Sequence, residues 1–302
     1  MKKFALLVGN GFTLDFIDSH KINIHSSFPL KSFNNLEINY QHFIDNLPHI
    51  QNELLGKDLD DYKMIESYAS KYKTGSIQEG QLRNFLALSY SHFQLKLDNY
   101  KFAEWKWAKW LQQNKDYLSC AVSFNYDLVL ERALRSVNIS YSRTGSNEPP
   151  RNDVSVLKPH GSIDFDFPSG LLPSPYLFGK GGYHTHLNNA GAVKILPKWE
   201  WLLLRTEADI IPPSVHNYQK KLRWVQTIFN TYESKSKQLE ALIIIGSSYW
   251  YVDRPEIDFF LQKLPKKAKV YIMHPKPSEP LTNKIESLGL SWEKFNFDEL
   301  PW

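Results

Sequence analysis

Three short polar stretches follow apolar runs in this sequence. GNGFT begins at Gly9, SFNYD begins at Ser123, and KPHGS begins at Lys158. Their side chains include an amide, a carboxylate and an imidazole, which can hold a polar substrate and move a proton. If the fold brings the three stretches together, they form a candidate acid–base site.

Each of these polar side chains also has a structural interpretation. Asn125 and Asp127 alternate in one loop and could both face a ligand, but either could instead cap the helix expected after them. His160 lies between Pro159 and Gly161, where a rigid turn could hold it as a general base. The alternative is a structural histidine that is bonded to backbone.

The first stretch indicates a phosphate site. Gly9 and Gly11 let a phosphate approach the backbone closely, and the helix expected next offers N–H groups at its positive end. Pyrophosphate is therefore the expected ligand. The stretch lacks the third glycine of a dinucleotide fingerprint and the lysine of a P-loop, so an ordinary tight turn stays open as the alternative.

The elements that must position these residues can be predicted from apolar patterning. Short apolar runs predict buried strands, and longer amphipathic stretches between them predict helices. Strands are expected at Phe4–Gly9, Leu118–Phe124, Ala241–Gly246 and Ala268–Met273, around VSVLKPHGSIDFDF, and near LSWEKF. This alternation predicts an α/β fold, a Rossmann-like doubly wound and mainly parallel sheet, whose ligands bind beyond the carboxyl ends of the strands.

Two further regions have a different character. Residues from about 31 to 115 have helical patterning and predict a helical insertion, in which Trp107 and Trp110 follow core spacing. A long helix is expected from Pro213 to Lys237. The glycine- and proline-rich stretch from Pro168 to Gly191 predicts loops.

Composition excludes several classes of protein. A formal net charge of +4 on 302 residues is too small to predict direct nucleic-acid binding. The single cysteine, Cys120, cannot form a disulfide within the chain and is expected to be a buried thiol. The apolar segment before GNG is only about six residues, too short for a signal peptide. A cytoplasmic protein without membrane spans is expected.

Taken in order, GNGFT, SFNYD, KPHGS, IIPPS and IIIGSSY resemble the sirtuin-like NAD-hydrolase family of bacterial anti-phage defence, also called the silent information regulator-like domain. The resemblance implies one sirtuin-like α/β domain over residues 1–302, with the helical insertion at about 31–115 inside it. It also implies that NAD is the substrate.

The resemblance assigns roles to particular residues. Its catalytic positions fall on Asn125, which would orient the ribose or the water, on Asp127, which would fix the nicotinamide side, and on His160, which would accept a proton. Its NAD-contacting positions fall on Gly9, Asn10, Gly11, Phe12, Thr13, Gly161, Ser162, Gly246, Ser247, Ser248 and His274.

The sequence departs from the family in three places. One cysteine cannot build the four-cysteine zinc module of deacetylating sirtuins, so neither zinc nor peptide deacetylation is expected. GSSY at Gly246 replaces a glycine-tyrosine-serine sequence, and His274 replaces an asparagine. His184 and His186 alternate as metal ligands can on a strand, but an exposed loop or a substrate lid is the preferred interpretation, and no metal site is expected.

The resemblance implies an NAD glycohydrolase that releases nicotinamide and ADP-ribose and acts as a regulated effector of abortive infection. It also implies a homo-oligomer and, as a separate partner, a hexameric DNA-translocating ATPase or an Argonaute-type protein. The alternative is a subunit of a defence complex that binds or senses NAD, or a related nucleotide, without cleaving it.

Overall fold

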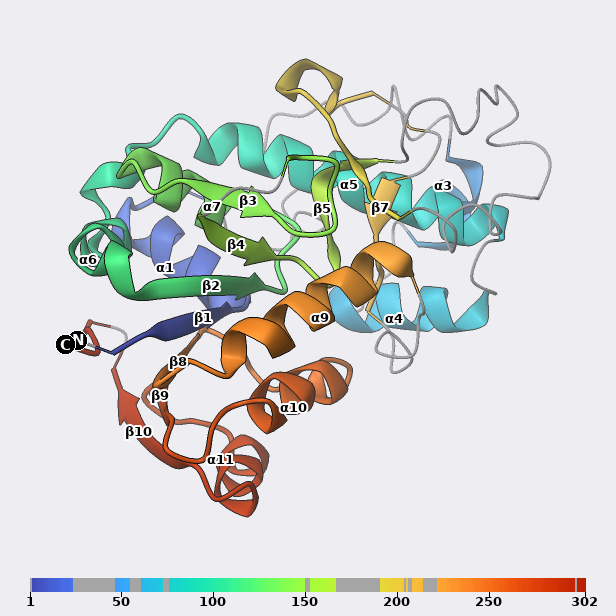
Figure 1. The fold of residues 1–302 in the computed structure, drawn as a ribbon. Coiled ribbons are helices and arrows are strands. Elements are labelled where there is room, and N and C mark those ends of the chain that lie inside the picture. Colours follow the sequence, from blue (N-terminus) through green and yellow to red (C-terminus); the bar gives the residue numbers. More distant parts are fainter. Residues whose placement is uncertain are drawn as a thin grey trace.

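The computed structural model describes residues 2–23, 47–54, 61–72, 76–149, 153–166, 191–203, 205, 208–213, 222–296 and 298–302. Within these ranges the chain forms a doubly wound α/β fold, and its two ends lie close together (Figure 1). The expected fold class is confirmed.

A seven-stranded parallel sheet forms the centre of the described structure, in the order β10-β9-β8-β1-β2-β4-β3. Its strands are β1 (Phe4–Val8), β2 (Leu118–Ser123), β3 (Tyr141–Arg143), β4 (Val154–Leu157), β8 (Ala241–Ile245), β9 (Lys269–Met273) and β10 (Ser291–Phe295). In the register, Leu6 lies between Ala121 on β2 and Ile243 on β8. Because the chain winds outward in opposite directions from β1 and β8, the topological switch point lies between these two strands.

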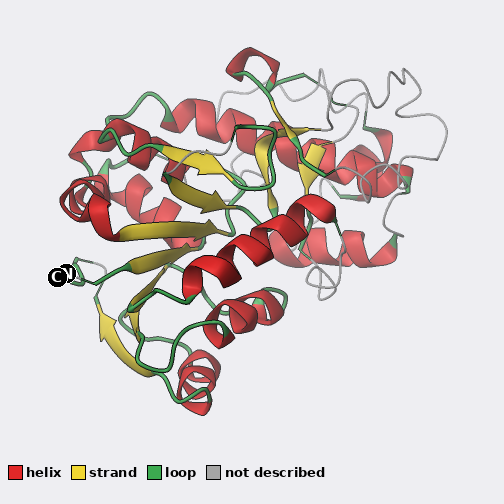
Figure 2. Cartoon of the chain, in the orientation of Figure 1, coloured by secondary structure: helices red, strands yellow, loops and turns green. Residues whose placement is uncertain are grey.

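Both faces of the sheet are covered by helices, which explains why its central strands are continuously apolar. Ala5 and Leu7 pack with α9 (Arg223–Ser236), α10 (Arg254–Gln262) and α11 (Glu279–Ser287). Phe4 and Leu6 pack on the other side with α1 (Asn10–Ser19), α6 (Lys106–Asn114) and α7 (Val129–Ser136). Figure 2 shows the resulting order of helices, strands and helices. Cys120 is a buried free thiol, as predicted, and burial raises its pKa to about 12.

The broken strand predicted around His160 is two strands that belong to different sheets. β4 ends at Leu157, and β5 (Gly161–Asp166) joins an antiparallel sheet with β6 (Lys194–Ile195) and β7 (Ala208–Ile210). These two short strands and β3 were not predicted, because two or three residues give no periodic signal. The turn that carries His160 therefore connects the two sheets.

The described chain between α1 and β2 is helical, and residues 24–46 lie outside the described part. It contains α3 (Pro48–Glu53), α4 (Asp61–Lys71), α5 (Ile77–Leu97) and α6. Ser76 caps α5 by accepting a hydrogen bond from the N–H of Glu79, three residues further along the chain. Trp107 and Trp110 are buried on α6, which confirms the predicted packed helix.

A predicted helix and a predicted loop lie in regions that the structure describes only in part. The helix predicted from Pro213 begins at Arg223 as α9, after Leu222 in a non-helical conformation, and residues 214–221 lie outside the described residues. The predicted loop from Pro168 to Gly191, with His184 and His186, lies outside them except for its last residue.

Glycines allow the loops after β1 and β8 to pack directly on each other. A Cβ on Gly11 would lie 2.6 Å from the Cα of Gly246, and a Cβ on Gly9 would lie 2.8 Å from the carbonyl oxygen of Gly246. Gly246 itself has a φ of +63°, which side-chain-bearing residues rarely adopt. The backbone contact at the switch point therefore requires these three glycines.

We expect Gly11→Ala to lower the free energy of unfolding by about 1–3 kcal/mol, because its Cβ would meet backbone that cannot rotate away. The matched control is Gly80→Ala in α5, where a Cβ meets nothing within 4 Å. Alanine has the higher helix propensity, so this control should gain up to about 1 kcal/mol. Urea unfolding monitored by tryptophan fluorescence measures both, and equal stabilities of the two variants would contradict the packing argument.

Candidate active site

A pocket of about 500 Å³ lies at the carboxyl edge of the parallel sheet, around the switch point. Residues that follow β1, β2, β8 and β9 form its floor, and α4, α5 and the turn before β5 contribute the rest of its wall. The lining residues are Gly9, Asn10, Gly11, Leu14, Lys63, Tyr90, Phe124, Asn125, Tyr126, Asp127, His160, Pro213, Gly246, Ser247, Ser248, Trp250, Asp253 and His274. All three predicted catalytic residues therefore lie on one pocket.

Asn125 joins the ends of β1 and β2. Its amide nitrogen donates hydrogen bonds to the carbonyl oxygen of Gly9 and to Oγ1 of Thr13, both at 3.0 Å. The Thr13 hydroxyl in turn donates to Oδ2 of Asp127 at 2.8 Å. Among the described residues none donates to Oδ1 of Asn125, so the amide oxygen is the atom that can accept a hydrogen bond from a ligand hydroxyl or from water.

Asp127 has a structural role in addition to its place on the pocket. Its Oδ1 accepts a hydrogen bond from the N–H of Val129, the first residue of α7, at 3.1 Å. Asp127 is not the predicted N-cap, because the N-cap residue of this helix is Leu128. The carboxylate is buried, and burial raises its pKa, against the opposing effect of the Lys158 charge. Asp127 therefore supports the loop between β2 and α7 and places a carboxyl group at the pocket wall.

His160 is held on two sides. Its Nε2 lies 2.6 Å from Oε2 of Glu256, which is 1% exposed on α10, and its ring centroid lies 4.9 Å from that of Phe124. The imidazole thus has a carboxylate partner in addition to any contact with backbone, and its role as a base or as a structural histidine stays a prediction. An imidazole paired with a carboxylate is an arrangement that supports general base chemistry.

Asp253 is the second carboxyl group beside this histidine. It lies on the pocket wall, and burial raises its pKa to about 6, with the His160 imidazole opposing this shift and Glu256 adding to it. A carboxyl group with a raised pKa beside an imidazole is typical of sites that transfer protons.

His160, Asp253 and Glu256 form a cluster of side chains that could ligate a metal ion. One ligand atom from each lies within 4.8 Å of the others. Two ligands on one zinc ion lie about 3.4 Å apart when each is bound at about 2.1 Å. Nε2 of His160 and Oε2 of Glu256 are only 2.6 Å apart, a hydrogen-bond distance. As arranged, these two atoms share a proton, and a metal ion would require them to separate.

Two N–H groups of the glycine stretch already have partners inside the protein. The N–H of Gly11 donates to the carbonyl oxygen of Gly246 at 2.9 Å, and that of Phe12 donates to Gly9 at 3.0 Å. These donors at the start of α1 are therefore used inside the protein. A bound phosphate would depend on the helix dipole, on Asn10 and on Lys63, which extends to the pocket from α4.

The remaining predicted contact residues divide into two groups. Ser247, Ser248 and His274 lie on the pocket, and Nδ1 of His274 accepts a hydrogen bond from the N–H of Lys276 at 3.1 Å. Four predicted contacts are absent from the described pocket lining and pack inside the protein, and their assignment as NAD contacts stays a prediction. They are Phe12, packed on Trp105, Thr13, bonded to Asp127, and Gly161 and Ser162, buried in β5.

Sequence reasoning missed Asp253, Glu256 and Lys63. The two acids begin the helix after β8, so their place beyond a carboxyl strand end was a signal that could have identified them. Lys63 had no such signal, because its helix, α4, does not directly follow a strand of the sheet.

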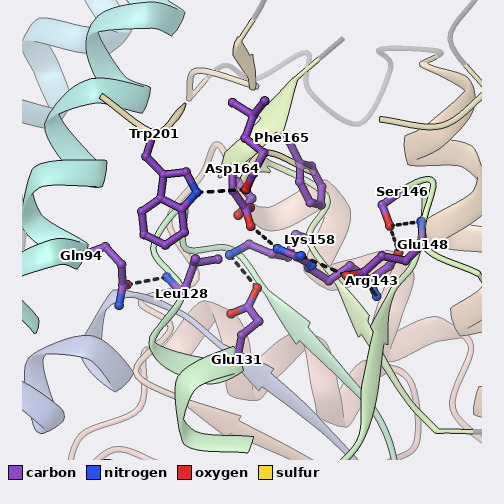
Figure 3. Close-up of polar contacts among 12 residues, drawn as sticks. Gln94, Leu128, Glu131, Arg143, Ser146, Glu148, Lys158, Asp164, Phe165 and Trp201 are labelled. Atoms are coloured by element: carbon purple, nitrogen blue, oxygen red, sulfur yellow. Dashed lines mark hydrogen bonds and ion pairs between the residues drawn. The ribbon is translucent and has the colours of Figure 1, made fainter. Parts of the chain in front are cut away.

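A network of buried charges supports the site from behind (Figure 3). Lys158 is completely buried, and its Nζ lies 3.1 Å from Oε1 of Glu131 and also donates to the backbone carbonyl of Asp127. Arg143 pairs with Asp164, and although burial favours the neutral acid, the charge of Arg143 holds the pKa of Asp164 below its usual value. Lys158 thus ties the Asp127 loop to the turn that carries His160.

We expect Asp253→Asn to stabilise the protein more at neutral than at acidic pH. The raised pKa means that the folded state binds more protons than the unfolded state between pH 3.8 and about 6, so stability falls as pH rises through this window. Asparagine removes that loss, which amounts to about 1 kcal/mol between about pH 5 and pH 7.5.

Urea unfolding of the parent and of Asp253→Asn at both pH values measures this effect. Asp116→Asn, at an exposed position, is the control and should show no such dependence. A gain that is the same at both pH values would contradict the raised pKa.

Among the residues that the structure describes, no helix has both the length and the apolar composition needed to cross a bilayer.

The fold and the pocket define a doubly wound α/β protein with a ligand site at its switch point. No protein-family model matches the chain, and no curated protein matches it. Among solved structures, the chain is similar to Sir2 homologues. One is a Sir2 homologue mutant with ADP-ribose (13% identity, 96% of this chain and 90% of that chain, TM-score 0.41). Another is a Sir2 homologue with NAD (13%, 97% and 84%, TM-score 0.34). A third is Sir2 with an inhibitor, 2'-O-acetyl-ADP-ribose and a deacetylated peptide (14%, 98% and 88%, TM-score 0.38).

Proposed function

We propose that this protein is an NAD glycohydrolase, which cleaves NAD to nicotinamide and ADP-ribose. One observation carries the proposal: an amide, Asn125, and a carboxylate-paired imidazole, His160, line the same pocket at the switch point of a doubly wound sheet. The solved structures with NAD and ADP-ribose named above are consistent with this substrate class.

The pocket has the size and polarity that a dinucleotide end requires. Its volume of about 500 Å³ is within the range of small-molecule sites. Gly9, Gly11 and Gly246 lie at its floor, and Lys63 supplies a positive charge to the wall. Aromatic side chains, including Phe124 and Trp250, provide apolar surface for flat rings.

The reaction makes limited chemical demands on the protein. Nicotinamide in NAD is already a cationic leaving group, so cleavage needs an oriented ribose, tolerance of positive charge at the ribose and a positioned water. Asn125 Oδ1 would accept a hydrogen bond from a ribose hydroxyl or from water. His160 would accept the proton released, and Asp127 and Asp253 would place negative charge near the developing cation.

We also propose that the enzyme is regulated, as an effector of abortive infection that acts as a homo-oligomer. A separate hexameric DNA-translocating ATPase or an Argonaute-type protein is the proposed partner, and the helices between α1 and β2 are the proposed contact region. Unregulated hydrolysis would deplete the cell of NAD, so such an enzyme requires control.

Product analysis tests the proposed activity. Purified protein is incubated with NAD beside Asn125→Ala and His160→Ala, and products are separated by chromatography. Release of nicotinamide and ADP-ribose by the parent alone is the expected result. Parent-like rates in both variants would contradict the assigned residues. NAD binding by calorimetry without products, also after addition of co-purified neighbours, would instead favour the nucleotide-sensing alternative.

A further inference from the structure

We infer that Glu256 is the positioning residue of His160: it accepts the Nε2–H hydrogen bond, fixes the tautomer of the imidazole and stabilises the imidazolium that forms when His160 takes a proton. The catalytic part of this inference rests on the proposed function. The contact itself does not, because it is a property of the folded chain.

The geometry favours a built pair. The two atoms are 2.6 Å apart, short even for a charge-assisted hydrogen bond, and both side chains are almost completely buried. The Glu256 carboxylate contacts the His160 imidazole directly. A buried carboxylate is costly unless it is paired, so this acid is retained in the interior by its contact with the imidazole.

Both partners are held by rigid elements. Glu256 lies in the first turn of α10, where its N–H donates to the carbonyl oxygen of Asp253 at 3.2 Å, and the next residue, Ile257, is buried in the core. The imidazole packs on the Phe124 ring, and the backbone carbonyl of His160 accepts a hydrogen bond from Ile211 at 2.9 Å. Glu256 is absent from the described pocket lining, so it acts through His160 and does not meet the substrate.

The proton balance follows from the tautomer. With Nε2–H donated to Glu256, Nδ1 is the nitrogen that accepts a proton. As the water oxygen bonds to the ribose carbon, its O–H proton moves to the imidazole. The electron pair of the glycosidic bond leaves with the nicotinamide nitrogen, and the imidazolium then returns its proton to solvent. The Glu256 carboxylate stabilises the charged imidazole through both steps.

Charged groups from several elements surround this pair and will shape its pH response. Asp253 precedes α10, Asp127 follows β2, Lys63 comes from α4 and His274 follows β9. Glu256→Gln changes one charge among these and keeps the length of the side chain.

We expect Glu256→Gln to lower kcat/KM for NAD by about 10- to 1000-fold, mainly through kcat, and to move the acidic limb of the pH profile to lower pH. Combined with His160→Gln it should cause little further loss, because the two residues act as one unit. The control is Glu240→Gln, an exposed acid at the opposite end of β8, which should behave as the parent.

A second measurement is independent of turnover. Histidine side-chain nitrogen NMR, with His160→Gln to assign the signal, should show the Nε2–H tautomer in the parent and its loss or exchange in Glu256→Gln. An Nδ1–H tautomer in the parent overturns the inference, and so does a Glu256→Gln variant with parental rate and pH profile. If His160→Gln keeps the parental rate, the assignment of His160 as the base fails, and if the parent does not cleave NAD, the proposed function fails. In both cases the NMR result still decides whether Glu256 sets the tautomer.

Discussion

His160→Ala is expected to reduce the rate of NAD cleavage by about 10²- to 10⁴-fold, the usual contribution of a general base. The structure adds a second effect, because alanine leaves the buried Glu256 carboxylate without its partner. That loss should cost about 1–3 kcal/mol of stability. Rates at saturating NAD, together with urea unfolding, separate the two effects.

His160→Gln is the variant that makes this test sharp. Its side-chain amide can still donate to Glu256 but cannot act as a base near neutral pH. We therefore expect near-parental stability with the same loss of rate. If His160→Gln cleaves NAD at the rate of the parent, His160 is not the base, whatever the stability of the alanine variant.

Lys158→Met is expected to lower the free energy of unfolding by about 3–5 kcal/mol, because it leaves the buried Glu131 carboxylate uncompensated. Lys158 is completely buried and lies 3.1 Å from that carboxylate. The rate of NAD cleavage should fall as well. The ammonium group of Lys158 donates to the carbonyl oxygen of Asp127, and Lys158 itself lies two residues before His160 in the chain. Denaturant unfolding and steady-state rates measure the two effects.

Two controls distinguish burial from charge alone. Lys101→Met removes a lysine from an exposed pair, 3.4 Å from Glu104, and should cost less than about 1 kcal/mol. Adding Glu131→Leu to Lys158→Met removes the orphaned charge and should restore part of the stability. A Lys158→Met midpoint equal to that of the parent would show that the network in Figure 3 carries no net energy.

The sequence was sufficient to predict the central strands and the meeting of distant polar stretches. Strands β1 and β8 are continuous apolar runs and β2 and β9 are mostly apolar, and parallel topology brings their carboxyl ends to one edge. This is why Asn125, His160 and Gly246 could be placed on one crevice from the sequence alone.

Other features depend on contacts that leave no local pattern. The pair of His160 and Glu256 joins residues 96 positions apart, through a turn between two sheets and the first turn of α10. The use of the Gly11 N–H by Gly246 is also invisible in sequence, although it weakens the phosphate-loop interpretation. Periodicity reports which face of an element is buried, but it does not report which polar atoms are already bonded.

The hydroxyl of Thr13 links the two strand ends on which the site depends. It accepts a hydrogen bond from Asn125 and donates one to Asp127, so moving either side chain away breaks its hydrogen bond to Thr13. The conformational entropy of these three side chains is therefore lost when the protein folds, and ligand binding does not have to order them again. We therefore expect the loops after β1 and β2 to open together and not one at a time.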